Sequence, residues 1–268
     1  MLVEGRHFLP GADARALGHK ALAVNLSDLA AMGAAPRWAT LALALPAADE
    51  VWLAGFSQGF FALAERHGVD LIGGDTTRGP LLTISVTAMG EVPSGVAMYR
   101  AGARPDDDIW VSGELGGAAL GLAHPEIPEA AERLHQPEPR VELGERLRGL
   151  ARAAIDVSDG LAGDLQHILN RSRVGASVQY DQIPRPAAFE TLKDRELEKD
   201  CVLSGGDDYE LLFTVARDRR KEVESLSREL KVPLTRIGSI RSGEPRLAIV
   251  DSSANPMSFR GGFDHFRR

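Results

Sequence analysis

The sequence predicts a protein of two domains with an α/β or α+β fold, and three observations lead to this prediction. The 268 residues suffice for one large domain or for two ordinary ones. Patterns typical of strands and of helices occur mixed together in two blocks of the chain. Between the blocks, the polar segment AGARPDDD contains glycine and proline, so we place a domain boundary there. The expected domains are residues 1–105 and residues 106–268.

Two helices are expected near the start of the first domain. The first is rich in alanine and leucine and extends from Asp13, which can cap its first turn, to Met32. Gly33 then suits the left-handed conformation that often follows a helix. The second helix covers residues 48–67, and Gly68 ends it in the same way.

Strands follow these helices, and the second domain mixes both elements again. Residues 69–72 are predicted to form a short buried strand that leads into Gly73 and Gly74. Between residues 82 and 88, apolar residues alternate with threonine and serine, which is the period of a half-buried strand. In the second domain, strands are expected over residues 109–112, 153–157 and 209–215, and helices over residues 118–123, 159–170 and 217–230.

The composition favours a soluble protein of the cytoplasm. The formal net charge of -7 argues against a nucleic-acid partner, because such proteins need basic patches. No apolar run is long enough to span a membrane, and the first residues, MLVEGRHFLPG, lack the pattern of a signal peptide. The lone Cys201 cannot form an internal disulfide, which is typical of a reducing compartment.

Two segments of the first domain carry candidate site residues. NLSDLAAMGA places Asp28 inside an apolar helical segment, where a buried carboxylate would need a cation. Taken alone, this segment is better explained by an aspartate on the solvent side of the helix, since most charges are exposed. LIGGDTTRG presents Asp75 after a strand and two glycines, a setting in which α/β proteins bind ligands. A tight turn with solvated polar residues explains this second segment equally well.

Two segments of the second domain also carry acidic residues at turns. In AIDVSDGL, a strand ends at Asp156, and Ser158 or Asp159 is expected to cap the following helix. Two neighbouring carboxylates favour a metal ion there, and the helix N-terminus favours phosphate, although a simple cap with solvated acids is the alternative. In LSGGDDYELLF, two glycines precede Asp207 and Asp208, and a turn alone would explain them.

Together the segments predict a phosphoryl-transfer site built on metal ions. The chain has several aspartates in glycine-rich or strand-end settings, yet it has no GxxxxGK[ST] loop. Carboxylates accept hydrogen bonds only, so they hold phosphate through Mg²⁺, which shares its shell between carboxylates and phosphate oxygens. Sequence patterns of zinc proteases, zinc modules and serine hydrolases are absent. His7 and His265 lie in short aromatic-flanked motifs and would not be selected by themselves.

In this order, NLSDLAAMGA, GGDTTRG, IDVSDGL, SGGDDYELLF and a terminal GFDHF resemble the bacterial thiamine-monophosphate kinases. The resemblance extends from Met1 to Phe266. Single segments also recur in relatives that make aminoimidazole ribonucleotide, selenophosphate or hydrogenase cofactors, but the combination looks specific to the kinases. It implies a two-domain fold like that of aminoimidazole ribonucleotide synthetase, in which the first domain pairs with its copy in a homodimer and ATP lies between the domains.

The resemblance also implies the activity and the roles of individual residues. The activity is ATP-dependent phosphorylation of thiamine monophosphate to thiamine diphosphate by direct in-line transfer. Several Mg²⁺ ions would be held by Asp28, Asp75, Asp156 and Asp159. ATP would contact Gly74, Asp75, Arg100 and Ser158, and thiamine monophosphate would contact His7, Asp207 and Phe263.

Two departures from the family pattern add expectations. Asp207 stands where the family usually has glutamate, so its substrate contact reaches one methylene less far. An acidic GDDAA-type motif and a Thr-Asp pair that normally precede the stretch matching residues 1–8 are absent. We therefore expect an incomplete first domain with an exposed sheet edge and little activity in the chain as given.

Two other functions remain open at this point. The chain could belong to a relative that uses ATP to activate a different acceptor, although such relatives should lack the GFDHF tail. It could also be an inactive nucleotide-binding or dimer-forming protein, since ligands expected before residue 1 are absent. ATP binding without phosphoryl transfer would favour this second alternative.

Overall fold

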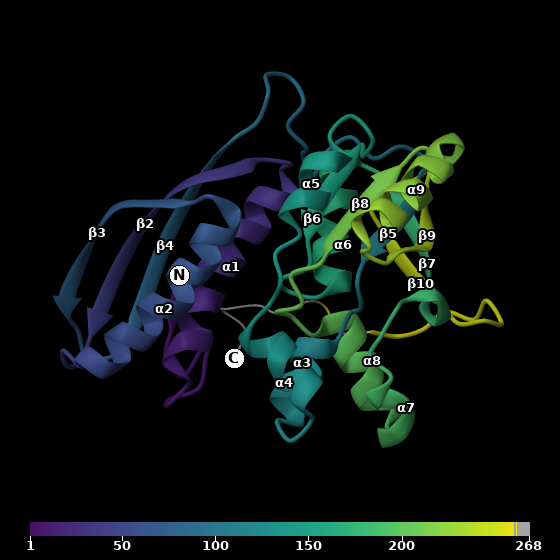
Figure 1. Cartoon of the computed structure of the whole chain (residues 1–268). Helices are drawn as coiled ribbons and strands as arrows, with labels where there is room; N and C mark the ends of the chain where they lie inside the picture. The colour runs from purple at the N-terminus through teal and green to yellow at the C-terminus, as the bar shows by residue number, and fades with distance from the viewer. Residues whose placement is uncertain (260, 262–268) are drawn as a thin grey trace.

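The computed structural model describes residues 1–259 and residue 261, and it contains two β-sheets with helices packed against them (Figure 1). The first sheet has four strands in the order β1-β4-β2-β3. Strands β2 and β3 are parallel, and the other pairs are antiparallel. The strands are β1 (Leu2–Val3), β2 (Ala35–Leu45), β3 (Asp70–Arg78) and β4 (Thr83–Glu91).

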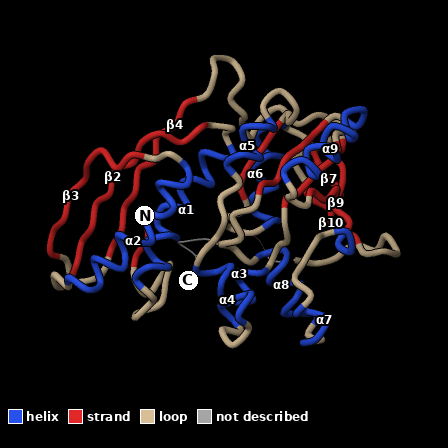
Figure 2. Tube along the Cα trace, viewed as in Figure 1, coloured by secondary structure: helices blue, strands red, loops and turns tan. Residues whose placement is uncertain are grey.

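Helices α1 (Ala14–Ala31) and α2 (Glu50–His67) lie side by side next to this sheet (Figure 2). The Asp13 side chain caps α1 by accepting a hydrogen bond from the Ala16 amide at 2.8 Å. Asp49 caps α2 in the same manner, and Gly68 ends α2 in a left-handed conformation with φ +64°. Both expected helices are therefore present within two residues of their predicted bounds.

Glycines bring the two helices into backbone contact. A Cβ atom at Gly18 of α1 would lie 2.0 Å from the carbonyl oxygen of Phe56 in α2. At Gly59 of α2, a Cβ atom would lie 1.8 Å from the carbonyl oxygen of Arg15. Contacts this short exclude every side chain, so the crossing of α1 and α2 depends on glycine at both positions.

The second sheet has six strands in the order β10-β7-β9-β5-β8-β6. Among the described strands of this second sheet, only β7 and β10 are parallel neighbours. The strands are β5 (Asp108–Ser112), β6 (Ala153–Asp156), β7 (Gly175–Gln179), β8 (Leu211–Val215), β9 (Leu234–Arg241) and β10 (Leu247–Val250). The α-helices are α3 (Gly117–Ala123), α4 (Pro128–His135), α5 (Val141–Leu147), α6 (Leu161–Ser172), α7 (Ala188–Leu192), α8 (Arg195–Ser204) and α9 (Arg220–Leu230). The 3₁₀ helices are η1 (Tyr180–Gln182) and η2 (Arg217–Arg219).

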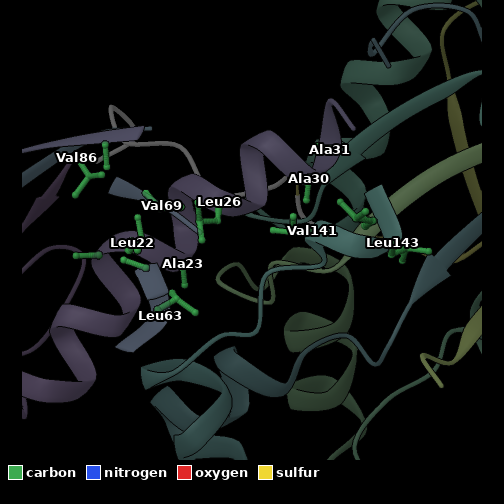
Figure 3. Close-up of a cluster of buried hydrophobic side chains, with 14 of the residues drawn as sticks. Leu22, Ala23, Leu26, Ala30, Ala31, Leu63, Val69, Val86, Val141 and Leu143 are labelled. Atoms are coloured by element: carbon green, nitrogen blue, oxygen red, sulfur yellow. The ribbon is translucent and has the colours of Figure 1, made fainter. Parts of the chain in front are cut away.

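One hydrophobic core joins the two sheets through α1. Leu22 and Leu26 of α1 are fully buried, and they belong to the same cluster as Val141 and Leu143 of α5 (Figure 3). The cluster continues into strands β6 and β8 of the second sheet. A loop over residues 92–107 connects β4 to β5 (Figure 2). The mixed α/β fold expected from the sequence is thus observed.

Strand β3 departs from the expectation of a short buried strand. It covers Asp70–Arg78, so the GGDTTR residues lie within the strand and not after its end. Ile72 is 58% exposed, and most other residues of β3 are exposed as well. The reason is its place in the sheet, because β3 is the edge strand and pairs only with β2 among the described strands.

Within the described part of the chain, no helix is both long enough and apolar enough to cross a membrane.

We predict that Gly59→Ala lowers the free energy of unfolding by about 1–3 kcal/mol, because the added methyl group collides with the Arg15 carbonyl. At an exposed helix position, alanine is more stabilising than glycine by about 1 kcal/mol. A lower free energy of unfolding in Gly59→Ala would therefore report the packing collision and not helix propensity. Urea denaturation measures the change. Gly55→Ala on the same helix is the control, since its methyl group would meet the Ala14 side chain at 3.2 Å, a contact that a small movement relieves, and no backbone atom closer than 3.8 Å. Equal stability of the two variants would contradict the close crossing.

Candidate active site

A cleft of about 740 Å³ lies between α1 and the second half of the chain. Lys20, Val24 and Asp28 of α1 all line it, because residues four apart share one face of a helix. The opposite face of α1 is buried in the shared core. Other lining residues include His7, Asn25, His135, Asp156, Ser158, Asp159, Gly206, Asp207 and Tyr209.

Asp28 and Asp156 form an acidic pair in the cleft. Asp156 ends strand β6 and is 3% exposed, and Ser27 Oγ donates a hydrogen bond to its Oδ2 at 2.7 Å. Burial, followed by the negative charge of Asp28, raises the pKa of Asp156 to about 6. Burial by the surrounding protein also raises the pKa of Asp28, although its side chain is open to the cleft. The Arg100 charge opposes both shifts, which places three predicted site residues within electrostatic reach of each other.

The turn after β6 differs from the predicted helix cap. Helix α6 begins at Leu161, and its N-cap residue is Gly160 with φ +106°, so neither Ser158 nor Asp159 caps it by a side chain. Instead, Asp164 Oδ2 accepts hydrogen bonds from the amides of Ser158 and Asp159, each at 3.0 Å. Asp164 of α6 thus holds the turn by its carboxylate, and Ser158 and Asp159 both remain in the cleft lining.

Lys20 is a cleft residue that the sequence patterns did not reveal. It is 3% exposed, and its Nζ donates to Asp207 Oδ2 and to the Leu134 carbonyl oxygen, each at 2.9 Å. A signal was present in the sequence, because Lys20 lies eight residues before Asp28 and so falls on the same side of this helix, which is rich in alanine and leucine. The ion pair joins α1 to the loop before β8, which are on opposite sides of the cleft.

His7 is in the cleft lining as well, where its Nδ1 accepts a hydrogen bond from the Val3 amide at 3.0 Å. Gly74 and Asp75 are not among the lining residues, since they lie within β3. A Cβ atom at Gly74 would lie 1.8 Å from the Leu41 carbonyl oxygen, so pairing with β2 already requires glycine there. Phe263 and His265 lie outside the described residues.

The donor chemistry of the cleft suits Mg²⁺. Among residues 1–259 and 261, no three His, Cys, Asp or Glu side chains are arranged as ligands of one metal ion. Magnesium in phosphoryl-transfer sites is usually held by one or two carboxylates, with water and substrate phosphates in the remaining positions. Asp28 and Asp156 meet that requirement, and a cation between them would relieve their mutual repulsion.

The fold and this acidic cleft define a member of the AIR synthase related proteins. Residues 1–92 match the N-terminal domain of that family, and residues 104–249 match its C-terminal domain. Within this class, the chain belongs to the thiamine-monophosphate kinase family. This membership confirms the resemblance found in the sequence.

Three relatives show the extent of the similarity. The thiamine-monophosphate kinase of Salmonella typhimurium is 45% identical over 276 residues, covering 99% of this chain and 84% of that protein. The crystal structure of thiamine-monophosphate kinase from Stenotrophomonas maltophilia is 50% identical with a TM-score of 0.88, covering 92% of this chain and 82% of that one. The structure of AaThiL complexed with AMPPCP and TMP is 30% identical with a TM-score of 0.85, covering 99% of this chain and 85% of that one.

We predict that Asp164→Asn changes how stability depends on pH. Burial raises the pKa of Asp164 to about 7 from the ordinary value of 3.8, so the folded state binds this proton more tightly than the unfolded state. The resulting stabilisation is complete below about pH 4 and is lost as the pH rises to about 7. Asparagine keeps an acceptor for the two amides but does not titrate.

The unfolding free energy of the wild type minus that of Asp164→Asn should therefore fall with rising pH, by at most about 1.4 kcal/mol per pH unit. Urea denaturation with EDTA, at several pH values between about 4 and 7, measures this difference. Parallel stability curves for the two proteins would show that the Asp164 carboxyl is already ionised throughout this range.

Proposed function

We propose that this chain transfers the γ-phosphoryl group of ATP to thiamine monophosphate, which yields thiamine diphosphate and ADP in thiamine diphosphate biosynthesis. The observation that carries the proposal is the acidic cleft between the two halves, found in a chain 45% identical to a thiamine-monophosphate kinase. A structural relative was solved with AMPPCP and TMP, which supports a site for both ATP and the acceptor. We place the reaction in the cytoplasm.

The chemistry requires little from the protein beyond alignment and charge neutralisation. The acceptor is a phosphate monoester with a second pKa of about 6, so it is largely dianionic near neutral pH and needs no general base. One of its oxygens attacks the γ-phosphorus while the bond to the β–γ bridging oxygen breaks and ADP leaves. Holding two polyanions in line is the main difficulty, because their charges repel each other.

Asp28, Asp156 and Asp159, with Asp75 on β3, are the proposed ligands of several Mg²⁺ ions. When bound, Mg²⁺ supplies the positive charge that neutralises the phosphate oxygens. Asp28 and Asp156 are already close enough for one charge to shift the pKa of the other. The raised pKa values of Asp28 and Asp156 arise mainly from burial, so a bound cation would favour the ionised carboxylates.

The other proposed contacts divide between the two substrates. The proposed contacts of ATP are Gly74, Asp75, Arg100 and Ser158. The charge of Arg100 already acts on the acidic pair. His7 and Asp207 contact thiamine monophosphate, and both line the cleft. Phe263, outside the described residues, is the proposed aromatic contact for the cationic thiamine.

A homodimer through the first sheet is part of the proposal. Helices α1 and α2 pack on one face of this sheet (Figure 1). On β2, the buried residues Ala39 and Leu43 alternate with more exposed ones that face the other way, including Trp38 at 39% exposure. This second face carries small and apolar side chains that suit a flat contact with a second copy.

Light scattering should give twice the chain mass of 28.8 kDa for the wild type. Trp38→Asp should shift the protein to the monomer, because a charge would be buried without a partner. Val51→Asp is the matched control, since Val51 is 84% exposed at the start of α2 and lies away from this face. A wild type with the mass of one chain at micromolar concentration would contradict the dimer.

Incubation with thiamine monophosphate, ATP and Mg²⁺ should produce equal amounts of thiamine diphosphate and ADP, both quantified by liquid chromatography. EDTA in excess of Mg²⁺ should abolish product formation. Folded protein that hydrolyses or binds ATP but forms no thiamine diphosphate would favour the inactive or different-acceptor alternatives.

The variant Asp159→Asn tests in the same assay whether this residue contributes to the metal site. It should lower kcat by about 100-fold without changing the thermal midpoint. Asp181→Asn makes the same chemical change at an exposed position of helix η1, outside the cleft lining, and should retain wild-type turnover. Normal turnover in Asp159→Asn would remove that residue from the metal site.

A further inference from the structure

A buried ammonium group lies at the floor of the cleft. The side chain of Lys20 is 4% exposed, although lysine is among the residues least often buried. Its charge is compensated by Asp207 Oδ2 and by the carbonyl oxygen of Leu134, each at 2.9 Å. The two acceptors come from α4 and from the loop before β8, so Lys20 of α1 is bound to two other elements at once.

The partner of Lys20 is held in an unusual backbone conformation. Asp207 and Tyr209 have positive φ angles of +69° and +51°, which non-glycine residues adopt only where the surroundings require them. Between them, the half-buried Asp208 carboxylate accepts hydrogen bonds from the amides of Gly116 and Ala118 at 2.6 and 3.1 Å. The loop is therefore anchored through Asp208 while the neighbouring Asp207 points to the cleft.

Both carboxylate oxygens of Asp207 have a donor. Lys20 donates to Oδ2, and the Tyr209 hydroxyl donates to Oδ1 at 2.9 Å. The side chain nevertheless stays 35% exposed, which leaves one edge of the carboxylate open to a ligand. A carboxylate oxygen has two lone pairs, so it can accept a further hydrogen bond from a substrate N–H group.

We propose that Lys20 is a positioning residue that fixes the orientation of the Asp207 carboxylate for recognition of the thiamine end of the acceptor. The inference rests on the proposed function, since it assumes that Asp207 contacts this substrate. We assign Lys20 to Asp207 and not to the phosphates, because two of its three N–H donors are taken by Asp207 and by the Leu134 carbonyl oxygen. It also ties the helix of the first domain to the loop of the second at the substrate end of the cleft.

A double-mutant cycle tests this role directly. Lys20→Met, Asp207→Asn and the double variant are compared by calorimetry for binding of thiamine monophosphate in the presence of Mg²⁺ and a non-hydrolysable ATP analogue. Each single variant should raise the Kd for thiamine monophosphate by about 10-fold. The Kd of the double variant should not exceed the larger of the two single-variant values. The Kd for the ATP analogue should stay within about 2-fold of the wild type in all three.

Two further variants keep the test decisive. Tyr209→Phe removes the other donor to Asp207 and leaves the buried charges paired, so it should weaken binding of thiamine monophosphate by about 3-fold even if Lys20→Met fails to fold. Lys221→Met makes the same change as Lys20→Met on the exposed side of α9 and should bind like the wild type.

The proposal is overturned if Lys20→Met weakens thiamine monophosphate binding as strongly in the Asp207→Asn background as in the wild type, since Lys20 would then act independently. If Lys20→Met weakened binding of thiamine monophosphate and of the ATP analogue equally, or weakened neither, the proposal would be overturned as well. A wild type that binds thiamine monophosphate without transferring phosphate would refute the proposed function alone, because this cycle is measured on Kd. A wild type that does not bind it overturns both.

Discussion

The structure depends on the close packing of helix α1 between the two halves of the chain. Its backbone contacts α2 at Gly18, and the carbonyl oxygen of Ala30 would lie 2.1 Å from a Cβ atom at Gly144 of α5. Where backbones meet without intervening side chains, neither helix can shift without opening a void. The face of α1 that carries Lys20 and Asp28 is fixed by the same contacts. The geometry of the cleft is therefore set by core packing.

Several buried charges of the second half have specific partners, and one such pair lies next to the helix that contacts α1. Glu210 pairs with Arg140 through two hydrogen bonds of 2.7 and 2.5 Å and also accepts one from Ser112. Arg140 directly precedes α5, so this pair holds the helix that contacts α1. Pairs of this kind cost about as much desolvation as they return in attraction, but losing one partner is expensive. This pair therefore specifies the position of α5 against the second sheet more than it adds stability.

The sequence predicted helices well and strands unevenly, for physical reasons. Asp13 and Gly68 mark helix ends by local hydrogen bonds, which a sequence pattern can report. Strand β2 (Ala35–Leu45) was not predicted, because its alanines and leucines favour helix and its pairing with β3 and β4 is not local. In the site, the motifs with Asp28, Asp156 and Asp207 indicated cleft residues, whereas the motif with Asp75 did not. Lys20 was missed because its role depends on Asp207, far along the chain.

The spacing of cleft residues along α1 limits how this protein can evolve. Inserting or deleting one residue within the helix rotates everything beyond it by about 100°. Such a change before Lys20 would rotate Lys20 and Asp28 away from the cleft towards the apolar core, and it would expose Leu22 and Leu26. It would also displace Ala30 from its contact with α5. Length variation in related sequences should therefore be confined to the loops, while α1 diverges only by substitution at a constant number of residues.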